Sequence, residues 1–309
     1  MSWLSGSKRG LGQGTIYLAG SVLDTDLMSV IRHYRRTIAS RYRSLSSDEL
    51  SELPPGSMHC SPKVDGELWF LVKLDKEAAL VSTNGRVIIG DVPLLTEAQQ
   101  TFATRAKAGT ILAGELFALS GQGRPRVGGV AQALAVDSDG ARLGFQAFDL
   151  VASDERVEPP EQYADRLAEV RRLLDGGKRV VGIKTDVVTT VDQVKELYEK
   201  YVESDKAEGL VVRSADRRIF KIKPTISLDC VVVGFTQRQD DPEQARSLLL
   251  GLTRADGSVQ LVGACGNLGT EDDRRAMKAS LEPLVVASRF RRGSSAGAVY
   301  RLTKPELVV

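Results

Sequence analysis

The chain has 309 residues, with 42 lysines and arginines against 40 aspartates and glutamates and a formal net charge of +2. With 42% hydrophobic and 27% charged residues, this composition excludes a disordered chain. The near-neutral charge means that any nucleic-acid surface must come from local clusters of arginine and lysine. No apolar run approaches the roughly 20 residues that a membrane-spanning helix needs, and three widely spaced cysteines suit a reducing compartment. We therefore expect a cytoplasmic protein of two domains that does not bind membranes.

Residues 1–55 predict a basic helical extension. Gly10, Gly12 and Gly14 resemble a phosphate-binding loop in their spacing, but no predicted strand precedes them and no clear helix follows, so we reject that interpretation. From residue 26 to residue 43, apolar residues recur at helical spacing while arginines occupy the other faces. The capping-box spacing of "SSDEL" predicts a second, short helix after residue 46.

Residues 56–226 alternate short strands with occasional helices. Strands are predicted over "GELWFLVKL", "AALVST", "RVIIG", "TILAGELFAL", "LGFQAFDLV", "GLVVRS" and "IFKIKP". Helices are predicted over residues 96–107 and over "YADRLAEVRRLL" and "VDQVKELYEKYV". An Asn-Gly turn between two of the strands is typical of an antiparallel hairpin. The pattern predicts an α+β domain with an antiparallel sheet and disfavours a doubly wound parallel sheet.

Residues 227–309 predict a second, smaller domain. Five short strands run over "DCVVVGF", "SLLLGLTR", "VQLVGACG", "AVYRL" and "ELVV", and one helix runs over "EDDRRAMKASLEPLV". Five strands with one internal helix suit a Greek-key β-barrel of the oligonucleotide-binding (OB) type. The predicted architecture is therefore a two-domain α+β protein.

Charged residues recur beside the hydrophobic strands of the larger domain. Lys63 precedes "VDG", Glu115 lies in "AGELFAL", Glu208 precedes "GLVVR", and Lys221 and Lys223 lie in "FKIK". Residues two apart in a strand share a face, so the last two lysines point the same way. Each residue taken alone is typical of a solvated strand end. Two ammonium groups on one enclosed face, however, require a polyanion, and a nucleoside triphosphate is the commonest small one.

This set of residues fits attack on a phosphate. A lysine attacks only as the neutral amine, so a nucleophilic Lys63 requires burial or neighbouring cations that depress its pKa. Carboxylates such as Glu115 and Glu208 would hold a Mg²⁺ ion that bridges phosphate oxygens. With only His33 and His59 in the chain, few residues could serve as the general base of a serine–histidine mechanism.

Five short motifs carry a resemblance to a known family. "KVDG" at 63–66, "GELFAL" at 114–119, "FQAFDLV" at 145–151, "EGLVVR" at 208–213 and "FKIKP" at 220–224 follow one another in order. They resemble motifs I, III, IIIa, IV and V of the ATP-dependent DNA ligases, members of the covalent nucleotidyltransferase superfamily that includes RNA ligases and mRNA capping enzymes. The resemblance covers about residues 60–305. It implies a nucleotidyltransferase (adenylation) domain at 56–226 and an OB domain at 227–309.

The resemblance also implies an activity and a site. Lys63 would attack the α-phosphate of ATP to form lysyl-AMP, and the AMP would pass to a 5′-phosphate end before a 3′-hydroxyl seals the strand. Phe148 would stack on adenine, and Asp65 would be a structural hydrogen-bonding partner or a water-mediated metal ligand. The implied nucleotide-binding residues are Ser61, Lys63, Glu115, Phe148, Glu208, Lys221 and Lys223, and the implied metal ligands are Asp65, Glu115 and Glu208, with ATP and Mg²⁺ as cofactors.

The chain departs from the DNA ligase pattern in places that leave alternatives open. Ser61 stands where the family has an acid, and Leu68 stands where it has an arginine; RNA ligases more often lack that arginine. The sequence ends at "KPELVV", before the family's basic motif VI, so we expect an incomplete OB domain or a partner chain that supplies the element. Three functions remain: a ligase of nicked DNA, an RNA ligase or end-adenylating enzyme, and a non-catalytic nucleotide- or nucleic-acid-binding subunit.

Overall fold

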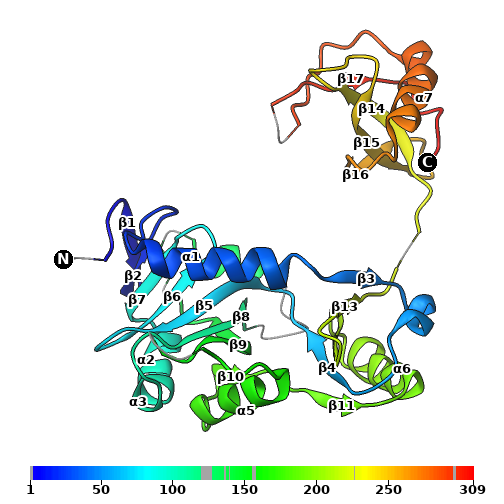
Figure 1. Ribbon diagram of the computed structural model, residues 1–309. Helices are drawn as coiled ribbons and strands as arrows, with labels where there is room; N and C mark the ends of the chain where they lie inside the picture. The colour runs from blue at the N-terminus through cyan, green and yellow to red at the C-terminus, as the bar shows by residue number, and fades with distance from the viewer. Residues whose placement is uncertain are drawn as a thin grey trace. The chain divides into compact units, whose positions relative to one another are not determined.

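Two compact units make up the chain in the computed structural model, one formed by Met1–Thr225 and the other by Ile226–Val309 (Figure 1). The structure describes residues 3–119, 127–135, 137–138, 140–154, 158–225, 227–294 and 297–309. Within these ranges, no helix combines the length and the apolar character that a membrane crossing demands. All the residues that the sequence predicts for the site lie in the first unit.

An eight-stranded sheet forms the larger part of the first unit. Its order is β1 (Lys8–Leu11), β2 (Gln13–Tyr17), β7 (Val87–Asp91), β6 (Ala78–Ser82), β5 (Glu67–Lys73), β8 (Ile111–Ala118), β9 (Leu143–Ala152) and β10 (Val180–Gly182). All neighbours pair antiparallel except β10, which is parallel to β9. The predicted α+β domain with an antiparallel sheet is confirmed.

Helices bury both faces of this sheet. On one face lie α1 (Thr25–Tyr34) and its π-helical continuation η1 (Arg35–Ala39); on the other lie α2 (Pro93–Gln100), α3 (Phe102–Arg105) and α4 (Val127–Ala133) (Figure 1). The remaining helix, α5 (Tyr163–Leu173), contributes Leu167 to the first face and Val170 and Leu173 to the second. Burial of these apolar stripes holds the sheet rigid.

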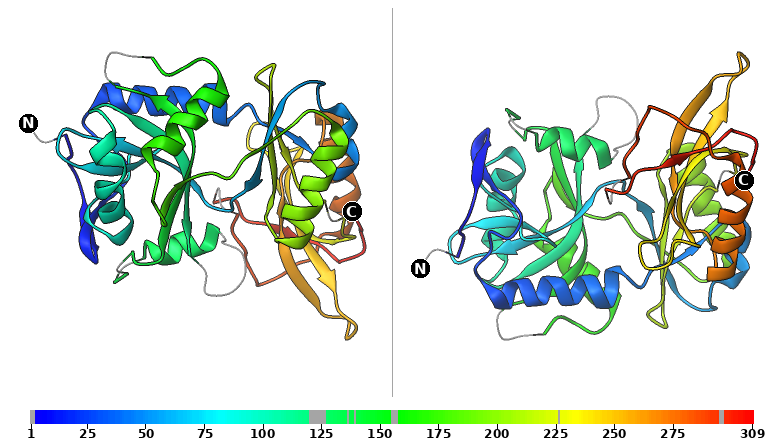
Figure 2. Two further views of the ribbon diagram at one scale, coloured as in Figure 1. Left: turned by 90° about the horizontal axis from the view of Figure 1, so that it is seen from below. Right: turned by 90° about the horizontal axis from the view of Figure 1, so that it is seen from above.

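The first 55 residues are built into the first unit, whereas we expected a separate extension. β1 and β2 form a hairpin that adds two strands at one edge of the sheet, drawn in dark blue in Figure 2. Gly12 makes the turn at a φ of 59°, and a side chain at Gly14 would lie 2.7 Å from the carbonyl oxygen of Ile89. The glycines thus serve a tight turn and a close strand approach, and their low strand propensity hid the hairpin from the sequence prediction.

A five-stranded sheet forms the rest of the first unit. Its order is β11 (Asp186–Val188), β4 (Met58–Lys63), β12 (Gly209–Ser214), β13 (Ile219–Ile222) and β3 (Arg43–Leu45). One face packs on α6 (Val191–Tyr198), its continuation η3 (Glu199–Ser204) and the 3₁₀ helix η2 (Ser47–Glu52). The predicted capping box of η2 is present, with Glu49 accepting a hydrogen bond from the Ser46 amide. The opposite face of this sheet carries polar residues.

The second unit contains a four-stranded antiparallel sheet. Its order is β16 (Val259–Cys265), β15 (Ala245–Thr253), β14 (Val231–Gln237) and β17 (Arg301–Leu302), with α7 (Glu271–Leu281) and the 3₁₀ turn η4 (Glu282–Leu284) beside it. Val308 forms an isolated bridge with Val231 where the last strand was predicted. A small antiparallel sheet with one helix is what the sequence predicts here, and a closed OB barrel stays a prediction.

Gly66, which directly precedes β5, offers a test of how closely the chain must approach β8 at this point. A methyl group at this position would lie 2.4 Å from the carbonyl oxygen of Leu116 in β8. We expect Gly66→Ala to lower the free energy of unfolding by about 1–3 kcal/mol, because backbone atoms on both sides must move. Gly10→Ala is the matched control, since no neighbouring atom lies within 4 Å of the added carbon. Urea unfolding measures both, and equal stability of the two variants would contradict the prediction.

Candidate active site

The polar face of the five-stranded sheet and one face of the eight-stranded sheet enclose a cavity of about 140 Å³. Its walls are Ala39, Tyr42, Ser61, Pro62, Lys63, Val64, Leu68, Glu115, Phe148, Ile183, Val211, Arg213 and Lys221. Strand register explains the arrangement. Ser61, Val211 and Lys221 lie side by side on three adjacent strands, and because side chains alternate between faces, their neighbours point into the core instead.

Lys63 lies at the end of β4, directly opposite Gly209 of β12. Its ammonium group pairs with the carboxylate of Glu208, and the second oxygen of that carboxylate accepts a hydrogen bond from Lys223 at 2.5 Å. Burial alone would raise the pKa of Glu208, but the hydrogen bonds from the two lysines outweigh it and lower the pKa. One carboxylate thus holds two lysines that are far apart in sequence.

Lys221 completes a positively charged wall. Its ammonium group lies 3.9 Å from the centre of the Tyr42 ring, a distance typical of a cation–π contact. Burial lowers the pKa of Lys221, and the charge of Lys63 lowers it further. Lys63, Lys221 and Lys223 therefore lie close together, and an anionic ligand would relieve their mutual repulsion.

Glu115 enters the cavity from β8. Burial raises its pKa to about 7, although the charges of Lys63 and Lys221 oppose this shift. One carboxylate oxygen of Glu115 is buried with no hydrogen-bond partner among the described residues, and so is the hydroxyl oxygen of Ser61. Buried polar atoms without partners are rare, and two in one cavity indicate a surface shaped for a polar ligand.

Phe148 forms another part of the wall, and the residue is 5% exposed. The guanidinium of Arg213 lies 5.2 Å from the centre of the Phe148 ring and 4.8 Å from that of Tyr163. Behind the ring, the neighbouring Asp149 accepts hydrogen bonds from Tyr34 at 2.9 Å and from Arg166 at 2.7 Å. This buried polar network fixes the strand that carries Phe148.

Tyr42 and Arg213 are cavity residues that the sequence analysis did not single out. The signal for Arg213 was present, because it lies two residues after Val211 in a strand and therefore shares its face. Tyr42 follows the π-helical turn and reaches the cavity only because β3 joins the edge of the sheet. Local periodicity contains no information on that placement.

A second cavity, of about 610 Å³, opens on another side of Lys63. Asp65 and Glu208 line this larger cavity, whereas Glu115 lines the smaller one. Within the described part of the chain, no three His, Cys, Asp or Glu side chains gather closely enough to hold a metal ion. A Mg²⁺ ion here would take one or two carboxylates and draw its remaining ligands from phosphates and water, as Mg²⁺ commonly does. Asp65 and Glu208 fit that requirement, and the ion stays a prediction.

Comparison with known proteins agrees with the geometry. Residues 36–223 match the model of the ATP dependent DNA ligase domain. The chain belongs to this family. Over 252 residues it is 25% identical to DNA ligase C2 of Mycolicibacterium smegmatis, covering 77% of this chain and 69% of that protein. It is also 26% identical to the DNA ligase of Enterobacteria phage T4 over 119 residues, covering 35% of this chain and 24% of the phage protein.

A solved structure, "Pmar-Lig_Pre.", has the same fold, with a TM-score of 0.60 at 18% identity over 85% of this chain and 66% of the other. Among the curated relatives, the matched part of the chain spans about a quarter of the phage ligase and about two thirds of the mycobacterial ligase. The segment matched by the family model contains every residue that the sequence analysis placed in the site.

The raised pKa of Glu115 predicts a pH-dependent stability. An isolated glutamate titrates near 4.5, so the unfolded chain loses this proton at lower pH than the folded chain does. The stabilising contribution is complete below pH 4.5 and disappears as pH rises through about 7. Relative to wild type, Glu115→Gln should therefore gain about 1–3 kcal/mol in free energy of unfolding between pH 4.5 and pH 8. Glu196→Gln, at an exposed position of α6, is the control. Parallel pH profiles for wild type and Glu115→Gln would contradict the assignment of the raised pKa.

Proposed function

We propose that the protein is an ATP-dependent DNA ligase that seals 5′-phosphate and 3′-hydroxyl ends through a lysyl-AMP intermediate. The observation that carries this proposal is the position of Lys63 in a chain of this family: it ends a rigid strand, borders both cavities and is flanked by Lys221 and Lys223. A fixed strand end holds the amine in line with the phosphorus atom, and positioning supplies much of the rate in phosphoryl transfer.

In the first step, Lys63 attacks the α-phosphate of ATP and pyrophosphate leaves. The amine must first lose its proton. Glu208 is the carboxylate in contact with that ammonium group, and it also binds Lys223. Lys221 and Lys223 then bind the oxygens of the α-phosphate, on which negative charge develops. Mg²⁺, when bound, would neutralise phosphate charge beside Asp65 and Glu208.

The nucleoside would occupy the smaller cavity. We assign Phe148 to the adenine ring and Glu115 to the ribose hydroxyls, because the unpartnered oxygen of Glu115 is free to accept a hydrogen bond. The unpartnered hydroxyl of Ser61 offers the base one polar contact. The AMP is then transferred to a DNA 5′-phosphate, and attack by the 3′-hydroxyl releases AMP and joins the strand.

Joining of RNA ends is the second candidate function. Leu68 lines the cavity where the DNA ligase pattern has an arginine, so the wall that faces the nucleotide is apolar at this point. Sealing assays on nicked duplexes with deoxyribose or ribose at the 3′-hydroxyl side separate the two functions. Preferred sealing of the ribose substrate would favour the RNA ligase.

A partner chain and a cytoplasmic location remain predictions.

The proposal makes Lys63 the residue that becomes covalently labelled. Incubation with α-labelled ATP and Mg²⁺ should label wild type and leave Lys63→Ala unlabelled, because the proposal assigns the attack on phosphorus to Lys63 and the binding of the phosphate oxygens to Lys221 and Lys223. Lys76→Ala, which removes an exposed lysine that lines neither of the two cavities beside Lys63, should be labelled normally. Denaturing electrophoresis reads the result. Label that persists on Lys63→Ala would mean that another residue is the nucleophile, and absence of label on wild type would favour the non-catalytic subunit.

Glu208→Ala should reduce labelling by at least about 100-fold, the usual effect of removing one electrostatic group from a reacting centre. The substitution frees Lys63 and Lys223 from their shared carboxylate and removes a predicted Mg²⁺ ligand. A Mg²⁺ titration of the labelling rate measures the loss. Unchanged labelling at every Mg²⁺ concentration would eliminate the assigned role of Glu208.

A further inference from the structure

The second unit carries an aromatic side chain among uncompensated positive charges. Residues 283–305 contain five lysines and arginines and no acidic residue, and one of the five, Arg301, pairs with Glu282 just outside this stretch. Within this stretch, Phe290 is 86% exposed and lies between Arg289 and the pair Arg291 and Arg292. We call residues 287–292 the arginine loop. A phenylalanine so exposed leaves apolar area in water that a stacked partner would cover.

Backbone hydrogen bonds anchor the arginine loop at both ends. The Val286 amide donates to the carbonyl of Leu302 in β17 at 2.9 Å, and the Tyr300 amide donates to the carbonyl of Arg292 at 2.9 Å. Inside the loop, the amide of Phe290 donates to the Ser288 hydroxyl at 3.1 Å. The loop therefore starts beside Leu302 of β17 and ends beside Tyr300, one residue before that strand, with Phe290 exposed between these two anchors.

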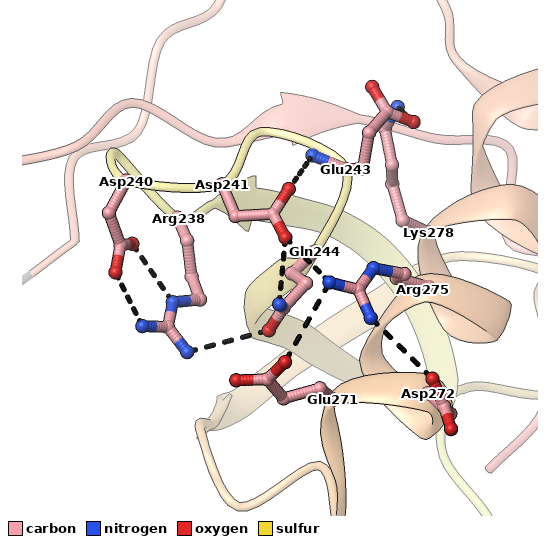
Figure 3. A network of polar contacts seen from close by, with 9 residues as sticks. All are labelled: Arg238, Asp240, Asp241, Glu243, Gln244, Glu271, Asp272, Arg275 and Lys278. Atoms are coloured by element: carbon pink, nitrogen blue, oxygen red, sulfur yellow. Dashed lines mark hydrogen bonds and ion pairs between the residues drawn. The ribbon is translucent and has the colours of Figure 1, made fainter.

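Many cations elsewhere in this unit are already paired. Figure 3 shows Arg238 held by Asp240, Arg275 by Asp241 and Asp272, and Lys278 close to Glu243. In contrast, the guanidinium groups of Arg289, Arg291 and Arg292 contact no acid or carbonyl in the part of the chain that the structure describes. Unpaired arginines on an exposed loop favour a polyanionic partner.

A depression of about 600 Å³ lies elsewhere on the second unit. Its lining includes Arg238, Arg246 and Arg274, with Asp240 as the single acidic residue. The hydroxyls of Tyr300 and Ser247 lie 3.2 Å apart, and Ser247 lines the depression while the Tyr300 amide binds Arg292. The loop is thus linked to the depression through the contact between Tyr300 and Ser247.

We propose that the arginine loop binds single-stranded nucleic acid, with Phe290 stacked on an unpaired base and its flanking arginines on the adjacent phosphates. Stacking on an exposed aromatic ring, combined with a basic track for the backbone, is how proteins bind unpaired strands without sequence preference. The depression lined by Arg246 receives further phosphates of the same strand. Binding of an unpaired base goes beyond the proposed sealing function, because a nick in a continuous duplex presents no unpaired base. The loop would instead suit ends with frayed or overhanging nucleotides.

The test uses fluorescence anisotropy of a labelled oligothymidylate with the full chain in the absence of ATP, so that the result does not depend on the proposed ligase activity. Phe290→Ala should weaken binding by about 5- to 150-fold, the equivalent of 1–3 kcal/mol of base stacking. Phe290→Trp should bind as tightly as wild type, while Phe290→Leu, apolar but unable to stack, should bind as weakly as Phe290→Ala. Val187→Ala, at a 61% exposed position of β11, is the control for loss of apolar surface.

Two further measurements complete the test. Arg291→Gln should flatten the dependence of binding on salt concentration, because one phosphate contact is lost, whereas Phe290→Ala should leave that slope unchanged. Unaltered binding by Phe290→Ala would overturn the proposal. So would Phe290-dependent binding to phosphatidylserine vesicles but not to the oligonucleotide.

Discussion

The antiparallel pairing of β4 with β12 is the constraint on which the site depends. It places Lys63 opposite Gly209 and so brings its ammonium group to the carboxylate of Glu208, although the two residues are separated by most of the domain. The pairing of β12 with β13 then adds Lys221 and Lys223. A slip of one residue in either pairing would turn these side chains into the apolar core on the other face. The hydrophobic cluster against α6 opposes such a slip, so the same burial that stabilises the sheet also sets the site's geometry.

The lysines of the site are not balanced by an equal number of ionised carboxylates. Three lysines converge at the site, and among the described residues Glu208 is the carboxylate that pairs with Lys63 and Lys223. Glu115 holds its proton up to about pH 7 because burial outweighs the attraction of the lysines. A protein without a ligand gains nothing from this arrangement, since burial of unbalanced charge is costly. The imbalance has a physical explanation if a triphosphate supplies the missing negative charge.

The two units contribute different chemistry. The first encloses a small cavity with unpartnered polar atoms, suited to a nucleotide. The second exposes an aromatic ring on a loop whose arginines pair with no acidic residue among those described, an arrangement suited to an extended polyanion. If both proposals hold, nucleotide and nucleic acid are recognised by different principles: hydrogen bonding and enclosure in one, stacking and phosphate contact in the other.

The sequence by itself determined the α+β class, the Ser46 capping box, the shared face of Lys221 and Lys223 and the motifs around Lys63, because each depends on spacing within one segment. The edge hairpin with Gly12, the entry of Tyr42 into the cavity and the division of Asp65 and Glu115 between two cavities were decided only by tertiary structure. These features depend on register between strands that are distant in the chain. Periodicity shows which face a residue occupies, but only packing selects the strand that lies beside it.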